Sequence, residues 1–356
     1  MNGKLRLFFI SFCLFLAAAV GCAVVIDPFF HYHAPLSGLF YRLDNERSQN
    51  RGIARFFTYD AIITGTSLTE GLKTSEWDAL MGTNTIKVPF SGATYYETGE
   101  LERIAFDSGH SPRFILRSLD VNHLIEESDA VRTDLGDYPE YLYNDRWWDD
   151  APYVCNIDVL ADYCLPAIGR RISGHKGGHT SFDRYAWSTY QPTDFLQERG
   201  GKPFDRAARQ NDFTQEDAQL LEENLERNIL SIAREHPETT FIFFLPPYNV
   251  AWWGGLMEDG EFVRTCTAMR RALIALTACE NIRVFAFADR TELTTHLELY
   301  QDEYHFINEV GSELLTWIAA GEGELAPQEV EDYCDRIEAY YEGFDYDRLM
   351  EAHDGD

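Results

Sequence analysis

Positive charge is scarce in this chain. Its 356 residues include 30 lysines and arginines against 59 aspartates and glutamates, which gives a formal net charge of −29 and a pI near 4.6. Binding to the phosphates of nucleic acid needs clustered cations, so this balance excludes a nucleic-acid-binding function. Tight binding to an anionic polymer would need local basic patches. We attribute the acidic excess to solubility.

Cysteine spacings that hold metals are also missing. Two of the seven cysteines, Cys13 and Cys22, fall in an apolar stretch near the N-terminus, and the others are Cys155, Cys164, Cys266, Cys279 and Cys334. No two of these have a Cys-x-x-Cys spacing, and we expect neither a metal nor a cofactor. Cys155 and Cys164 could form a disulfide in an oxidising compartment, and burial as free thiols is the alternative.

The N-terminus predicts a membrane anchor. Lys4 and Arg6 precede an uncharged run at 7–26, which Asp27-Pro28 closes. A run of this length matches the roughly 30 Å hydrocarbon thickness of a bilayer. Because cations precede the run and none follows at once, we expect residues 1–6 in the cytoplasm and the rest of the chain outside it. A cleaved signal peptide and lipidation at Cys22 are the alternatives, but no clear Ala-x-Ala site follows the run.

Strand and helix patterns alternate in most of the remaining sequence. Apolar stretches predict strands at 59–64, 85–90, 113–119, 239–245 and 282–288, and amphipathic patterns predict helices at 75–81, 95–106, 215–235 and 261–278. This alternation is typical of a parallel sheet covered on both faces. We therefore predict an α/β fold, a three-layer sandwich with about five central strands, over residues 59–320.

Three stretches do not show this alternation of strand and helix patterns. Residues 27–58 lack clear periodicity, and we expect a juxtamembrane segment that packs across the domain surface. Residues 124–214 are rich in Asp, Tyr, Trp, Gly and His, and a connection this long is usually functional, so we predict a cap inserted over the strand ends. Residues 321–356 form an acidic C-terminal tail, either a helix packed through its aromatics or a mobile segment.

Two short motifs contain the candidate catalytic residues. The first presents Ser67 on a small-residue turn directly after the strand at 59–64, and the second is an Asp-x-x-His formed by Asp302 and His305. Taken singly, Ser67 could be a helix cap, and Asp302 could cap the helix that begins near Asn308. Together they supply the nucleophile, the base and the orienting carboxylate of a catalytic triad. We predict that Ser67, His305 and Asp302 act in this way.

The order of these motifs resembles the SGNH (GDSL-like) hydrolase superfamily, in which the nucleophile comes early and an Asp-x-x-His comes late. The turn reads Gly-Thr-Ser here, which is similar to the membrane-anchored branch related to DltD, AlgJ and AlgX. In that superfamily a glycine after the second strand donates its N–H to the oxyanion, and Gly92 matches it in position. The third donor of the superfamily is an asparagine, to which Asn122 corresponds, with Asp120 as a competing polar group that contacts substrate or positions Asn122.

The resemblance implies O-acyl transfer or ester hydrolysis on a glycan of the cell envelope. We therefore expect a single-pass membrane protein with an extracytoplasmic catalytic domain, an envelope glycan as substrate and a membrane-bound O-acyltransferase as a possible partner. The alternative is a catalytically silent envelope protein that binds a glycan or an acyltransferase through the same cleft. The distance between the Ser67 hydroxyl and the His305 ring distinguishes the two hypotheses.

Overall fold

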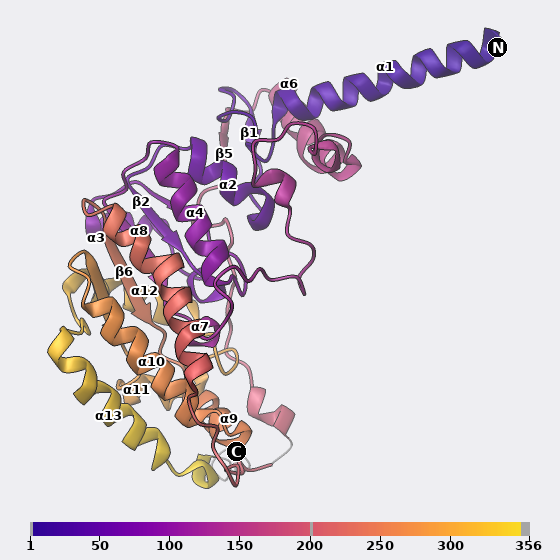
Figure 1. The fold of residues 1–356 in the computed structure, drawn as a ribbon. Helices are drawn as coiled ribbons and strands as arrows, with labels where there is room; N and C mark the ends of the chain where they lie inside the picture. The colour runs from indigo at the N-terminus through magenta and orange to yellow at the C-terminus, as the bar shows by residue number, and fades with distance from the viewer. Residues whose placement is uncertain (1–2, 200–201, 350–356) are drawn as a thin grey trace.

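A five-stranded parallel sheet forms the centre of the fold. The computed structural model describes residues 3–199 and 202–349 (Figure 1). The strands are β2 (Ala61–Thr64), β3 (Thr85–Lys87), β4 (Phe114–Ser118), β6 (Thr240–Leu245) and β7 (Ile282–Ala286), in the order β3-β2-β4-β6-β7. All four pairings are parallel, which confirms the predicted five-strand parallel sheet. All five carboxyl ends therefore lie at one edge.

Buried apolar residues form the middle of the central strands. Ile62, Ile115 and Ile242 are at most 1% exposed, and Ile62 is in register with Ile115. A strand buried on both faces needs such residues, because neither side of it meets water. β3 is shorter than the predicted 85–90, although the N–H groups of Val88 and Phe90 still donate to the carbonyls of Ile63 and Gly65. Pro89 between them has no N–H to donate.

Helices connect and flank the strands. α4 (Tyr95–Asp107) begins at a capping box in which Thr94 and Glu97 satisfy each other's backbone N–H groups. One continuous helical stretch is divided into α7 (Gln215–Leu225), the π-turn η6 (Glu226–Leu230) and α8 (Ser231–Glu235), and it packs against α4. α10 (Phe262–Thr277) packs against α7, whereas α3 (Thr74–Met81) packs against α12 (Asn308–Ala320). The shorter helices on the C-terminal side are α9 (Val250–Asp259), α11 (Thr291–Thr294), η7 (Leu297–Leu299) and η8 (Pro327–Glu329).

One N-terminal helix, α1 (Gly3–Ile26), is long and apolar enough to cross a membrane. It projects from the rest of the protein in Figure 1. Residues 3–18 are exposed, but Ala23 and Ile26 near its end are buried in the core. Asp27 follows at once and is fully buried, where it accepts hydrogen bonds from the backbone N–H groups of His31, Tyr32 and His33 and from the hydroxyl of Tyr153. The helix therefore ends inside the fold.

The segment at 27–58 is more regular than its sequence pattern suggested. It contains the two-residue strand β1 (Phe40–Tyr41) and an unpredicted helix, α2 (Glu46–Phe56), whose first turn is capped by the Asn45 side chain. Its mostly polar sequence hides the periodicity, because Gln49, Asn50 and Arg51 are buried through hydrogen bonds rather than through apolar contact. α2 packs against α4.

Residues 124–214 contain only short elements. They are η3 (Glu140–Leu142), α5 (Ala151–Val154), the π-turn η4 (Val159–Cys164), α6 (Leu165–Ile172), β5 (Gly178–His179) and η5 (Phe195–Arg199). β5 pairs in parallel with β1, which ties this segment to the juxtamembrane region. Cys155 is exposed and Cys164 is buried, and both are free thiols in the structure.

The C-terminal stretch includes a packed helix, α13 (Val330–Glu342). Its Tyr333, Ile337 and Tyr341 are buried, and the helix packs against α10 and α9. Of the two alternatives for this stretch, a helix packed through its aromatics describes residues 330–342. The remainder of the predicted tail at 350–356, like residues 1–2 of the predicted cytoplasmic end, lies outside the described residues.

Shortening a side chain in the central strand tests this core. Leu116 on β4 is fully buried between β2 and β6. We expect Leu116→Ala to lower the free energy of unfolding by about 2–5 kcal/mol, because it removes buried methyl groups and leaves a cavity. Leu80→Ala, at a position 43% exposed on α3, is the control and should change it by less than about 0.5 kcal/mol. Urea unfolding of the detergent-solubilised chain, followed by tryptophan fluorescence, measures both values, and equal effects would contradict the assigned core.

Candidate active site

The structure brings Ser67, His305 and Asp302 together. The Ser67 Oγ lies 2.7 Å from the His305 Nε2, although the two residues are 238 positions apart. On the other side of the ring, His305 Nδ1 lies 2.7 Å from Asp302 Oδ2 and 2.9 Å from Asp302 Oδ1. A hydroxyl, an imidazole and a carboxylate connected in this order form the chain along which a proton leaves a nucleophile.

Ser67 is held by the turn that follows β2. Gly65 has φ +130°, and a Cβ there would lie only 2.4 Å from the Ser118 hydroxyl on β4. A side chain at position 65 would therefore push the two strand ends apart. Ser67 then begins the short helix η1 (Ser67–Thr69), which the Thr66 side chain caps by accepting from the N–H of Leu68. The turn thus presents the Ser67 side chain at the carboxyl edge of the sheet.

The loop that carries Asp302 and His305 is fixed on several sides. The Asp302 carboxylate accepts the backbone N–H groups of Tyr304 and His305, and its carbonyl accepts from the side-chain amide of Asn249 beyond β6. The Tyr190 ring stacks on the His305 ring at 4.7 Å between centroids, and its hydroxyl donates to the Ser67 carbonyl. Tyr190 therefore contacts both the base and the turn of the nucleophile.

These contacts also set the charge of Asp302. Burial opposes its ionisation, but the hydrogen bonds from the His305 ring and from two backbone N–H groups outweigh burial and hold the pKa of Asp302 below its usual value. Asp302 is therefore ionised at neutral pH. A carboxylate in this form and position can stabilise an imidazolium at His305.

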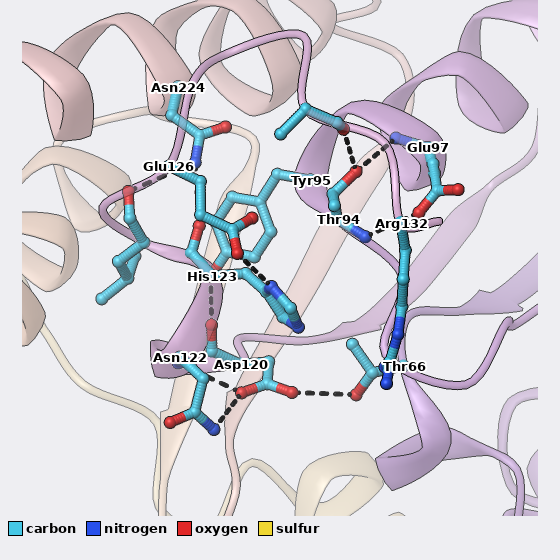
Figure 2. Close-up of polar contacts among 12 residues, drawn as sticks. Thr66, Thr94, Tyr95, Glu97, Asp120, Asn122, His123, Glu126, Arg132 and Asn224 are labelled. Carbon is cyan, nitrogen blue, oxygen red and sulfur yellow. Dashed lines mark hydrogen bonds and ion pairs between the residues drawn. The ribbon is translucent and has the colours of Figure 1, made fainter. Parts of the chain in front are cut away.

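Asp120 lies at the centre of a second polar network (Figure 2). Its Oδ2 accepts from the Thr66 hydroxyl at 3.2 Å, and its Oδ1 accepts from the Tyr248 hydroxyl at 2.9 Å. The same Oδ1 accepts from the backbone and side-chain amides of Asn122, at 3.2 and 3.0 Å. Asp120 is 7% exposed, so these bonds compensate for the burial of its charge. It fixes the orientation of the Asn122 side chain, one of the two roles we considered for it.

Three hydrogen-bond donors belong to residues that line the cavity beside Ser67. Within the described part of the chain, the backbone N–H groups of Ser67 and Gly92 have no hydrogen-bond partner. The third donor is the side chain of Asn122, which is exposed and lines the same cavity. Ser67, Gly92 and Asn122 follow β2, β3 and β4 respectively, so the arrangement has the order of an oxyanion site.

Arg132 lies against one residue of this donor group, Gly92. Gly92 has φ +61°, and a Cβ built there would lie 1.1 Å from Nη1 of Arg132. The guanidinium therefore lies directly against the glycine backbone, where it donates to the Ser91 carbonyl at 3.3 Å and pairs with Asp134. Only glycine allows this close approach.

The triad opens into a cavity of about 590 Å³. One wall consists of residues at the ends of the strands, and the other comes from the 124–214 segment, which contributes Arg132, Leu135, Ser188 and Tyr190. Figure 2 shows His123 and Arg132 above Thr66 and Asp120.

His123, which lines the same cavity, has a raised pKa. Burial lowers the pKa of His123, but its hydrogen bond to Glu126 and the nearby Asp120 outweigh burial and leave the pKa raised. Leu135 and Tyr304 add apolar surface to this polar cavity.

A buried carboxylate completes the floor of the cavity. Glu70 is 3% exposed, and its two oxygens accept the hydroxyls of Ser91, at 2.5 Å, and of Ser188. The ammonium of Lys87 donates to the carbonyls of Glu70 and Leu72, and burial lowers its pKa to about 8. This lysine fixes the backbone directly after the serine turn.

Sequence patterns did not reveal several of these residues. Tyr190, Ser188 and Arg132 lie in the irregular 124–214 segment, where no periodicity marks a position as facing the cavity. Tyr248 follows the Pro246-Pro247 pair at the end of β6, so its place after a strand was the available signal. Glu70 lies three residues after Ser67, so its place in the turn after β2 was the available signal. Their roles depend on contacts between distant parts of the chain.

Comparisons with known proteins add little to this geometry. No family model matches the chain, and no curated protein matches it. Among solved structures, the chain is similar to one described as "a putative platelet activating factor from Streptococcus pneumonia", at 12% identity and a TM-score of 0.35, over 81% of this chain and 90% of that chain. A similarity this weak carries no argument about function.

Substitutions of Asp120 test the second network. We expect Asp120→Ala to lower the free energy of unfolding by about 1–3 kcal/mol, because it leaves the buried hydroxyls of Tyr248 and Thr66 without their acceptor. Asp120→Asn is the matched control, since it keeps the size and one carbonyl oxygen, and its effect should be smaller. Chemical denaturation of the two variants beside the parent chain measures the difference. If Asp120→Ala and Asp120→Asn lower the free energy of unfolding equally, the Asp120 carboxylate does not hold these turns together.

Proposed function

We propose that this protein is a membrane-anchored serine esterase or O-acyltransferase of the SGNH-like type, acting on O-acyl groups of a cell-envelope glycan. The observation that carries the proposal is the 2.7 Å contact between Ser67 Oγ and His305 Nε2, with Asp302 on the other ring nitrogen. A silent binding protein would not need these three groups in this order. The catalytically silent alternative is therefore the weaker hypothesis.

The reaction follows from these positions. The Ser67 oxygen attacks the ester carbonyl while His305 Nε2 accepts its proton, and the N–H groups of Ser67 and Gly92 with the amide of Asn122 stabilise the resulting oxyanion. Collapse of the tetrahedral intermediate breaks the bond to the leaving oxygen, which receives the proton from His305. Attack on the acyl-Ser67 ester by water or by a sugar hydroxyl then releases the acyl group and restores the serine.

The finer architecture belongs to the same proposal. A three-layer sandwich with residues 124–214 as an inserted cap is supported by the contribution of this segment to one wall of the cavity. The cap supplies Tyr190 against His305 and Arg132 against Gly92. It would exclude water from the acyl-enzyme and hold an acceptor sugar, which favours transfer over hydrolysis.

The proposal includes a retained anchor and an extracytoplasmic catalytic domain. Cations precede the apolar run of α1, which favours translocation of the chain that follows. Ala23 and Ile26 lie in the core, and the Tyr41 hydroxyl donates to the Ile26 carbonyl. Cleavage of the helix would remove these contacts, so retention fits the packing better than a cleaved signal sequence does. A membrane-bound O-acyltransferase beside the anchor would deliver the acyl donor to Ser67.

Removal of the nucleophile or the base tests the chemistry. Ser67→Ala and His305→Ala should each abolish nearly all activity on an activated ester, and Asp302→Asn should lower kcat by up to about 10⁴-fold because it favours the wrong tautomer of His305. A fluorophosphonate probe should label Ser67 in the parent chain and not in Ser67→Ala. Ser91→Ala, at a cavity serine whose hydroxyl donates to the Glu70 carboxylate and not to a histidine, is the matched control and should keep the label. Turnover that survives Ser67→Ala would remove the proposal.

Transfer and hydrolysis are distinguished by the fate of the acyl group. Both reactions share the acyl-Ser67 intermediate and differ only in whether water or a sugar hydroxyl attacks it. We expect slow hydrolysis of a simple ester and a rising share of acylated sugar as an envelope glycan is added. Chromatography of free acid and acylated glycan over a range of acceptor concentrations measures this partition. If free acid remains the sole product at saturating glycan, the protein is an esterase.

A further inference from the structure

Exposed apolar side chains are concentrated in one short stretch of the chain. Outside α1, six described large hydrophobic residues are more than half exposed, and five of them lie between positions 147 and 172. The sixth, Leu135, lines the cavity beside Ser67. We name the five the lipid patch, and they are Trp147 (78%), Trp148 (66%), Ile157 (66%), Leu165 (54%) and Ile172 (81%). Apolar side chains gathered in this way mark a surface that contacts something other than water.

Leu165 and Ile172 of the patch lie on α6, Trp147 and Trp148 lie in the loop before α5, and Ile157 lies between α5 and η4. Both α5 and η4 pack against α1, and α6 continues directly from η4 (Figure 1). The Phe29 ring, just beyond α1, stacks on Tyr153 of α5 at 5.2 Å and meets Tyr163 of η4 at 5.1 Å. Leu165 and Ile172 are seven residues apart on α6, so they share one face of that helix. Ala167 on another face is buried.

The length of α1 determines how deep these elements lie. The uncharged run at 7–26 is about 30 Å long at 1.5 Å per residue, which equals the hydrocarbon thickness of a bilayer. Residues 19–22 are nevertheless partly covered by protein, and Ala23 and Ile26 are buried, although Val24 and Val25 stay exposed. The exposed part of the helix, residues 3–18, measures only about 24 Å and is too short to cross alone. The covering elements must therefore reach the outer boundary of the hydrocarbon.

Charge is unevenly distributed along the stretch that carries the lipid patch. Residues 147–164 include Asp149, Asp150, Asp158 and Asp162 and no lysine or arginine, so the cations lie only in its C-terminal part. Residues 165–182 include Arg170, Arg171 and Lys176 and no aspartate or glutamate, in a chain whose formal net charge is −29. Arg171 and Lys176 are exposed. Cations beside an exposed apolar helix face are the pattern of a segment that lies in the interface of an anionic bilayer.

We propose that α5, η4 and α6 form a lipid-binding platform, in which the lipid patch enters the outer leaflet beside α1 and Arg171 and Lys176 contact anionic headgroups. This proposal depends on the proposed function, in which α1 is retained as a membrane-spanning helix. It holds the catalytic domain against the bilayer at a second point, so the domain does not swivel about the anchor.

Lipid contact of position 172 tests the platform. The probe is an environment-sensitive fluorophore on Ile172→Cys, in a full-length chain whose Cys13, Cys22 and Cys155 are replaced by serine. The matched control is Ile274→Cys on α10, an exposed isoleucine away from α1. The chain is reconstituted in vesicles of neutral and anionic phospholipid in a 3:1 ratio, with or without lipids that carry a quenching group near the headgroup. We expect a blue shift and quenching at position 172 and neither at position 274.

Two further measurements separate the possible failures. Sedimentation of the vesicles reports whether the chain is anchored, and thermal unfolding reports whether each labelled variant is folded. A folded chain that sediments with the vesicles but shows equal, unquenched emission at positions 172 and 274 would overturn the platform while the anchor stands. A chain released from the vesicles would overturn the retained anchor of the proposed function. A second variant, Leu165→Cys, should give the same blue shift as Ile172→Cys.

Discussion

One buried carboxylate joins the three strands on which the candidate site depends. Asp120 follows β4, Thr66 follows the neighbouring β2, and Tyr248 follows β6 on the other side, and both hydroxyls donate to Asp120. Adjacent parallel strands bring their carboxyl ends to one edge, but they do not fix the turns beyond it. The Asp120 network does so, because the bonds from Thr66 and Tyr248 join Asp120 to two other turns, and Asn122 is held within the turn of Asp120 itself. The Ser67 turn and the Asn122 side chain take their positions from this network.

The base is supported from outside the sheet. The loop with Asp302 and His305 contacts the region beyond β6 through Asn249 and contacts the 124–214 segment through Tyr190. His305 is therefore held between two parts of the chain that do not themselves form strands of the sheet. Its ring keeps one nitrogen toward Asp302 and the other toward Ser67, which is the orientation a proton transfer requires.

Local patterns in the sequence predicted much of this molecule. Most strands of the sheet contain a run of buried apolar residues, and Ser67 follows β2 closely. The Asp302–His305 pair lies further from its strand, beyond β7, α11 and η7. A helix such as α2 was missed because hydrogen bonds bury its Gln49 and Asn50, and a polar helix has no apolar stripe to detect. Arg132 and Tyr190 were missed because their positions result from contacts over long sequence separations, as between the Tyr190 hydroxyl and the Ser67 carbonyl, 123 residues apart.

The 238-residue separation of Ser67 from His305 also has a consequence for biogenesis. The nucleophile leaves the ribosome early, whereas its base and the strand before it, β7, come near the end of the chain. While the chain is being synthesised, the serine therefore has no base beside it, and it remains an ordinary hydroxyl. The contact between Ser67 and His305 can form only after the segment beyond β7 has been made. The order of the elements along the chain thus makes this contact one of the last that the folding chain can complete.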